Sequence, residues 1–124
     1  MKVLVYETTR DRAKLIQDLL GEYRYKLYIN YESSPSLKDI QELKPSLIIL
    51  NANKREHVAF LETLSQNQAL SKIPVILISN KNSRELVEKV TRLPHLDYLV
   101  EPFKIKNFRH IVERWVNFKS LYVN

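Results

Sequence analysis

The sequence predicts an α/β fold in which helices cover both faces of a parallel sheet. Five times along the 124 residues, a short apolar run is followed by a helical pattern, with short connections between them. Two of the runs, residues 47–50 and 75–78, contain only apolar residues, as is typical of strands covered on both faces. Strict alternation of strand and helix favours a parallel sheet with crossover helices.

The elements follow in order along the chain. In the first half we expect strands at 3–6, 26–30 and 47–50, and helices at 10–20, from Ser34-Pro35 to 43, and 57–64. In the second half we expect strands at 75–78 and 98–100, and helices at 83–93 and 105–122. Each helix is defined by apolar residues that recur at helical spacing.

Local signals predict three helix ends. Thr8 and the acidic residue three positions later form a possible capping box for the first helix. Pro35 suits the first position of a helix, where its missing N–H costs nothing. Gly21, the single glycine, stands where a helix end favours positive φ.

Composition limits the function. With one glycine, the chain lacks the Gly-rich loops that let phosphate approach a backbone, which excludes P-loop, dinucleotide-binding and kinase folds. The absence of cysteine fits a reducing compartment, and the short apolar start fits neither a signal peptide nor a membrane span. We therefore expect one cytoplasmic domain over residues 1–124.

Chemistry in such sheets gathers where the strands end. The residues at those positions are Glu7, Thr8, Asn51, Ser79 and Glu101. They contain no nucleophile beside an activating base, so we expect no enzyme. The three histidines are scattered, and neither a metal site nor a cofactor is expected.

Four runs in register, residues 2–7, 45–51, 73–79 and 97–103, resemble the receiver domain of bacterial response regulators, the CheY-like family. The resemblance covers essentially the whole chain. It implies a flavodoxin-like, doubly wound, five-stranded parallel sheet in the order 2-1-3-4-5, with five helices. It also implies phosphoryl transfer from a histidine kinase to an aspartate after the third strand, assisted by Mg²⁺ and a lysine.

The sequence departs from that pattern at the phosphorylation site. Asn51, a neutral amide, stands at the phosphoacceptor position. Thr8 replaces the second carboxylate of the Mg²⁺ pair, leaving Glu7 alone. Glu101 replaces the lysine and reverses its charge. We expect a pseudo-receiver that is not phosphorylated, with Glu101 paired to Lys54 or Arg55.

Two further positions match the family. Ser79 stands at the switch hydroxyl and Tyr98 at the switch aromatic. The resemblance implies a two-state surface of the fourth helix, fifth strand and fifth helix, here driven without phosphate. An ordinary serine after a buried strand and an ordinary edge-strand tyrosine explain the same residues equally well.

The apolar residues of the last helix cover an arc of about 160°, wider than the roughly 100° needed to pack on one sheet. The excess favours a partner or self-association surface. Its expected members are Phe108, Ile111, Trp115, Phe118 and Tyr122.

The net charge of +6 supports an alternative. A basic rim of Lys54, Arg55, Lys81 and Arg84 near the strand ends could bind nucleic acid or an anionic ligand. The preferred hypothesis is a regulatory module of a signalling pathway that contacts other proteins, with a homodimer as one option and no membrane partner.

Overall fold

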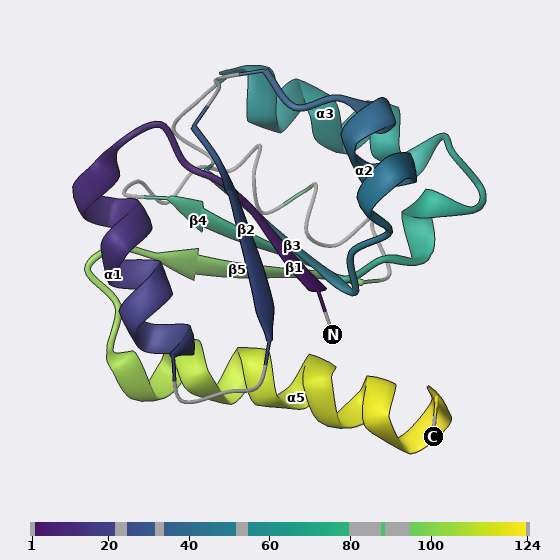
Figure 1. The fold of residues 1–124 in the computed structure, drawn as a ribbon. Helices are drawn as coiled ribbons and strands as arrows, with labels where there is room; N and C mark the ends of the chain where they lie inside the picture. The colour runs from purple at the N-terminus through teal and green to yellow at the C-terminus, as the bar shows by residue number, and fades with distance from the viewer. Residues whose placement is uncertain are drawn as a thin grey trace.

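The computed structural model describes residues 2–21, 25–31, 34–51, 55–79, 88 and 95–123, with side chains described as far as 115 in the last helix. One parallel sheet has the order β2-β1-β3-β4-β5, which confirms the predicted fold class (Figure 1). The strands are β1 (Lys2–Tyr6), β2 (Lys26–Asn30), β3 (Leu47–Asn51), β4 (Val75–Ser79) and β5 (Leu96–Val100).

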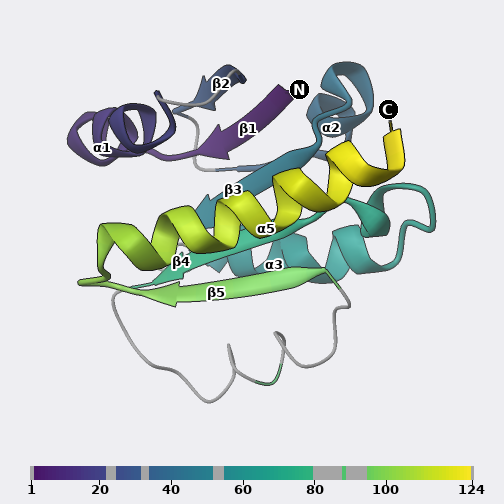
Figure 2. The same cartoon turned by 90° about the horizontal axis from the view of Figure 1, so that it is seen from below.

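Helices cover both faces of the sheet (Figure 2). On one face lie α1 (Arg10–Leu20) and α5 (Ile105–Val123). On the other lie α2 (Leu37–Leu43) and α3 (Arg55–Ser65), the latter followed by the 3₁₀ turn η1 (Leu70–Lys72). The helix expected at 83–93 falls outside the described residues. Within the described parts, no helix combines the length and apolar character needed to cross a membrane.

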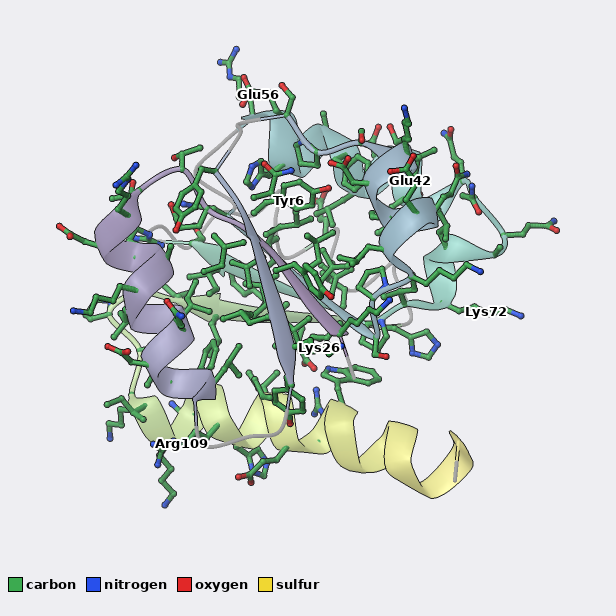
Figure 3. All side chains as sticks on the ribbon, viewed as in Figure 1. Tyr6, Lys26, Glu42, Glu56, Lys72 and Arg109 are labelled. Atoms are coloured by element: carbon green, nitrogen blue, oxygen red, sulfur yellow. The ribbon has the colours of Figure 1, made fainter. Side chains whose placement is uncertain are left out.

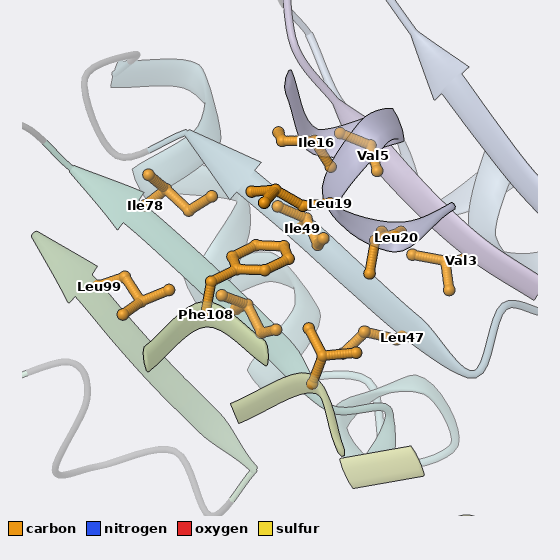
Figure 4. Packing of buried hydrophobic residues seen from close by; sticks show 12 residues of the cluster. Val3, Val5, Ile16, Leu19, Leu20, Leu47, Ile49, Ile78, Leu99 and Phe108 are labelled. Carbon is orange, nitrogen blue, oxygen red and sulfur yellow. The ribbon is translucent and has the colours of Figure 1, made fainter. Parts of the chain in front are cut away.

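The core is divided by the sheet into two clusters because neighbouring residues of a strand point to opposite faces. In β3, Leu47 and Ile49 pack toward α1 and α5, whereas Ile48 and Leu50 pack toward α2 and α3. Figure 4 shows the first cluster, in which Phe108 of α5 lies over the sheet. β3 is thus buried along its whole length, up to Asn51 at its carboxyl end.

Two predicted helix starts are wrong by one or two residues. The N-cap of α1 is Thr9 rather than Thr8, and its side chain makes no capping hydrogen bond. For α2 the N-cap is Ser36, whose hydroxyl accepts the backbone N–H of Asp39. Pro35 therefore precedes the cap instead of opening the helix, because the hydroxyl that reaches the third helical N–H decides the start.

The helix ends also differ from expectation. Gly21 has a φ of −65°, in the right-handed region that any residue adopts. Positive φ occurs instead at Lys44, with φ 54°, where the N–H donates to the carbonyl of Ile40 at 2.8 Å. The glycine is thus not required by backbone conformation at position 21.

Phe108, which we expected on an exposed partner surface, is fully buried at 0% exposure. Its ring stacks on Phe103 with centroids 5.6 Å apart. The helical arc of apolar residues is wide, but its Phe108 and Val112 positions face the sheet. This residue belongs to the core and is removed from the partner surface.

We expect Phe108→Ala to lower the free energy of unfolding by about 3–5 kcal/mol, because the truncation leaves a cavity between α5 and the sheet. Ile105→Ala, at a 52% exposed position of the same helix, is the matched control and should change stability by less than about 0.5 kcal/mol. Urea unfolding followed by circular dichroism measures both. Equal losses in the two variants would contradict the burial of Phe108.

Candidate functional site

The carboxyl ends of four strands bring the expected residues together. Glu7 follows β1 and Asn51 ends β3, and the Asn51 amide Nδ2 donates to Glu7 Oε1 at 3.1 Å. Glu101 follows β5, and its backbone N–H donates to the carbonyl of Ser79 at the end of β4. Glu7, Asn51 and Ser79 are all buried. The structure thus brings these four residues to one edge of the sheet.

Arg12, in the first turns of α1, bridges the two carboxylates of the site. Its Nε donates to Glu7 Oε1 at 2.9 Å. Its two terminal nitrogens donate to the two carboxylate oxygens of Glu101, the Nη1 bond measuring 2.6 Å and the second pairing Nη2 with Oε1. This two-pronged geometry is the strongest form of an arginine–carboxylate contact.

The partner of Glu101 among the described residues is Arg12, which we did not expect. Sequence reasoning paired Glu101 with Lys54 or Arg55, of which Lys54 lies outside the described residues and Arg55 is an exposed residue at the start of α3. Arg12 reaches Glu101 instead because α1 begins right after β1, at the same edge of the sheet. Sequence reasoning did not place Arg12 among the site residues.

Glu7 is only 1% exposed, and both oxygens of its carboxylate accept hydrogen bonds. Oε1 accepts from Arg12 and from the amide of Asn51, and Oε2 accepts the backbone N–H of Thr9 at 2.8 Å. The carboxylate also lies at the N-terminus of α1, where the helix dipole favours negative charge. Burial of this charge is compensated by a cation and two further donors.

His57 is a site residue that sequence reasoning did not single out. It is fully buried in α3, and its Nδ1 accepts the backbone N–H of Asn51 at 3.0 Å. An accepting Nδ1 carries no proton, so the imidazole is neutral. Tyr6 packs edge-on against the ring with centroids 6.0 Å apart. The available signal in the sequence was that His57 lies only six residues after Asn51, close enough for its side chain to return to the end of β3.

The described charges of the site are the guanidinium of Arg12 and the carboxylates of Glu7 and Glu101. Partial burial of Arg12 disfavours its charged form, but hydrogen bonds and attraction from Glu7 and Glu101 outweigh this and raise the pKa of Arg12. A raised pKa for a base means that its contribution to stability is complete below its ordinary value and is lost only as the pH rises through the raised value. The bridge by Arg12 is thus charged throughout the neutral range.

The donor set does not fit the Mg²⁺ that the resemblance implies. Mg²⁺ requires oxygen ligands in near-octahedral geometry and is usually held by more than one carboxylate or phosphate. Here Thr8 stands at the second acidic position, and both oxygens of Glu7 already accept hydrogen bonds. The guanidinium of Arg12 lies against the remaining carboxylate. We derive no step through a metal.

The two switch positions lie in different surroundings. Ser79 is 1% exposed at the end of β4, whereas Tyr98, in β5, is half-buried and packs against the cluster under α2 and α3. A conformational coupling between them stays a prediction. Of the basic rim, Arg55 is described and exposed, and Lys54, Lys81 and Arg84 fall outside the described residues.

The described part of the expected partner surface is anchored to β5. Arg114 and the indole N–H of Trp115 both donate to Asp97 Oδ2, and the guanidinium lies 5.4 Å from the Trp115 ring centroid. Trp115 and Ile111 are half-buried, while the side chains of Phe118 and Tyr122 lie outside the described part. The helix and the edge strand thus form one continuous surface.

The chain is similar to proteins of two-component signalling. It is 25% identical over 86 residues to the probable C4-dicarboxylate response regulator DctR of Bacillus subtilis (strain 168), covering 68% of this chain and 37% of that protein. It is 24% identical over 102 residues to the circadian input-output histidine kinase CikA of Synechocystis sp. (strain ATCC 27184 / PCC 6803 / Kazusa), covering 82% and 14%. No protein-family model matches.

The fold is also found among solved structures. The signal receiver domain of a LuxO repressor protein from Vibrio parahaemolyticus superposes with a TM-score of 0.82 at 20% identity, over 97% of this chain and 92% of that one. The fold is therefore that of a CheY-like receiver domain. The chain spans well under half of the length of the two curated proteins it matches.

We expect Arg12→Ala to destabilise the protein by about 3 kcal/mol, because it leaves the buried carboxylate of Glu7 without its cation. Arg12→Lys should recover only part of the loss, since an ammonium does not span two carboxylates as the planar guanidinium does. The measurement is the free energy of unfolding in urea at neutral pH.

Arg10→Ala is the matched control, because Arg10 is an exposed arginine of the same helix. Its effect should stay within about 0.5 kcal/mol. If Arg12→Ala were no more destabilising than this control, the bridge would not contribute to the fold.

Proposed function

We propose that the chain is a receiver-like signalling module that works without phosphorylation, has no enzymatic activity and acts through contact with other proteins. The observation that carries the proposal is the bridge in which Arg12 occupies Glu7 and Glu101 at once. The receiver fold and the similarity to response regulators support the regulatory role. The rest of the proposal depends on the chemistry at the strand ends.

The first argument concerns the nucleophile. Phosphoryl transfer to a receiver needs a carboxylate after the third strand, and the side chain there is the amide of Asn51. An amide is a poor nucleophile. Its Nδ2 donates to Glu7, and its backbone N–H donates to His57. Asn51 therefore serves as a donor to the buried carboxylate.

The second argument concerns charge. A phosphoryl group at this edge would lie beside Glu101, where like charges at about 4 Å repel by roughly 4 kcal/mol at an effective dielectric constant near 20. Among the described residues, the guanidinium that lies at this edge is that of Arg12, and it is already shared between two carboxylates. Accepting a phosphoryl group would require this bridge to break.

The third argument concerns the contact surface. Asp97, Arg114 and Trp115 fix α5 against β5, while Ile105 at the start of α5 is 52% exposed. Trp and Arg are among the residue types most enriched at interface centres, and both lie on this helix, which also carries an exposed apolar side chain at its start. We propose that the face formed by β5 and α5 is the partner surface. Ile111 and Trp115 are members of this surface whose side chains the structure describes.

Incubation with acetyl phosphate or with beryllofluoride and Mg²⁺ tests the first part of the proposal. We expect intact mass and backbone amide spectra to stay unchanged, because nucleophile, metal ligands and clamp are all altered. Asn51→Asp restores only the carboxylate and should also remain unmodified while Arg12 and Glu101 are in place. The positive control is a receiver domain that retains its aspartate, and its phosphorylation shows that the acetyl phosphate is active.

A gain of one phosphoryl mass in the wild-type chain, or beryllofluoride-dependent shifts at Asn51 and Ser79, would refute phosphorylation independence. If only Asn51→Asp gained a phosphoryl group, the Arg12 bridge would not prevent phosphorylation. The missing carboxylate at position 51 would then explain by itself why the wild-type chain is not phosphorylated.

A photo-crosslinking amino acid in place of Ile105 tests the contact surface in cells. We expect a defined crosslinked protein, because this side chain projects from the proposed face. Lys38 on α2 lies on the opposite face of the sheet and supplies the control position. Crosslinks from position 38 but none from position 105 would place the partner surface on the wrong side of the sheet.

A further inference from the structure

The outer edge of β2 has no strand neighbour in the described sheet, in which β2 pairs with β1 alone. Figure 2 shows β2 and β5 at opposite edges, so this edge is remote from the β5–α5 face. The strand has the sequence KLYIN, with one charge and no proline. Natural edge strands usually carry charges, prolines or bulges that discourage pairing with another chain. β2 carries little of this protection.

The backbone of β2 presents a regular set of polar groups to that edge. The carbonyl of Asn30 accepts the N–H of Glu7, so even-numbered residues of β2 direct their backbone groups toward β1. Alternate residues of a strand face opposite edges. The N–H and C=O groups of Leu27 and Ile29 therefore face outward, two residues apart.

This spacing is self-complementary. If a second β2 runs antiparallel with Tyr28 on the two-fold axis, Leu27 lies opposite the partner's Ile29, and Ile29 lies opposite the partner's Leu27. Each of these pairs exchanges two backbone hydrogen bonds. All four outward pairs of donor and acceptor are then satisfied, and the two sheets become one.

The exposed aromatic residues of this edge fit the same arrangement. Tyr28 is 38% exposed and Tyr31, just after the strand, is 51% exposed. On the two-fold axis, Tyr28 meets the partner's Tyr28 in a position where cross-strand side chains are closest. Tyr31 comes opposite the partner's Tyr25. Both exposed rings gain an aromatic neighbour.

Charges are also complementary in this register. Lys26, the one charged residue of the strand, lies at its start (Figure 3) and comes opposite the partner's Asn30. Asn30 donates to Asp39, and Asp39 lines a groove of about 600 Å³ between β2 and α2 together with Tyr28 and Glu42. Lys26 thus approaches an acidic groove.

The other side of the edge adds a second complementary contact. A groove of about 680 Å³ beside α1 is lined by Arg10, Lys14 and Asp18, with Tyr31 at its margin. A two-fold axis at Tyr28 sets the α1 helices of the two copies in opposite directions. The basic end of one α1 then faces the Asp18 end of the other.

From these observations we propose that two copies of the chain associate through the outer edges of β2, antiparallel about Tyr28, into one continuous ten-stranded sheet. The occupant of this edge is a second copy because the spacing of the outward backbone groups, the tyrosines and the charges all match under one two-fold axis. The dimer leaves the β5–α5 face of each copy open for a partner.

Sedimentation velocity over a wide range of protein concentration tests the dimer. We expect the sedimenting mass to approach twice that of a single chain. Tyr28→Lys should weaken the dimer about tenfold or more, since it removes the cross-strand aromatic pair and sets like charges side by side. Ile105→Lys, at a still more exposed apolar residue of α5, is the matched control and should leave the dimer intact.

Hydrogen exchange of the wild-type chain gives a second measurement that needs no variant. The amides of Leu27 and Ile29 should become protected as concentration rises, while those of exposed loop residues do not change. A chain that stays monomeric at every concentration overturns the proposal, and an edge that pairs only with another protein would behave in this way. A dimer that Ile105→Lys dissociates and Tyr28→Lys does not would also overturn it.

These outcomes are independent of the proposed function. Phosphoryl uptake would refute the pseudo-receiver and leave the β2 dimer untouched. A monomeric chain would refute the dimer and leave the inert phosphorylation site as it is.

Discussion

The ion pairs of Arg12 hold together the carboxyl edge of the sheet. Through this one side chain, Glu7 after β1 is joined to Glu101 after β5, although β3 and β4 lie between those strands. A buried carboxylate without a cation or donors is costly. The position of Arg12 in the first turns of α1 is therefore what allows Glu7 to remain charged in a buried place.

The neutral residues of the site are arranged around the same carboxylate. Asn51 donates its side-chain amide to Glu7 and its backbone N–H to His57. An aspartate at position 51 could make the backbone contact but would place a second carboxylate against Glu7. Asn51 and the neutral imidazole of His57 thus belong to one hydrogen-bond network, in which the Asn51 amide supplies a donor to the buried carboxylate of Glu7.

Much of this structure could be predicted from the sequence because it depends on apolar periodicity. The buried runs of β3 and β4 and the alternation of strands with helices define the sheet, and the strand ends bring Glu7, Asn51, Ser79 and Glu101 together. The partner of Glu101 was not predictable in this way. It depends on which long side chain reaches across the edge of the sheet. Arg12 does so because α1 starts at this edge, although Arg12 and Glu101 are far apart in the sequence.

Phe108 shows a second limit of the sequence. The apolar arc of α5 is wider than one sheet requires, so periodicity alone does not decide which part of the arc faces inward. The sheet decides it, since Phe108 and Val112 fill the space over β3 and β4 that α1 leaves. The start of α2 also escapes prediction from periodicity, because the capping hydroxyl of Ser36 decides it.

The charge balance at this edge also bears on how the site could change in evolution. Two carboxylates share one guanidinium, so a lone Asn51→Asp would add a third negative charge where the amide now donates to Glu7. A lone Glu101→Lys would set a second cation beside Arg12. Each of these single reversals toward an ordinary receiver meets a charge that the site already holds, the carboxylate of Glu7 for Asn51→Asp and the guanidinium of Arg12 for Glu101→Lys. Under the proposed function, a phosphorylatable site would therefore require several substitutions together.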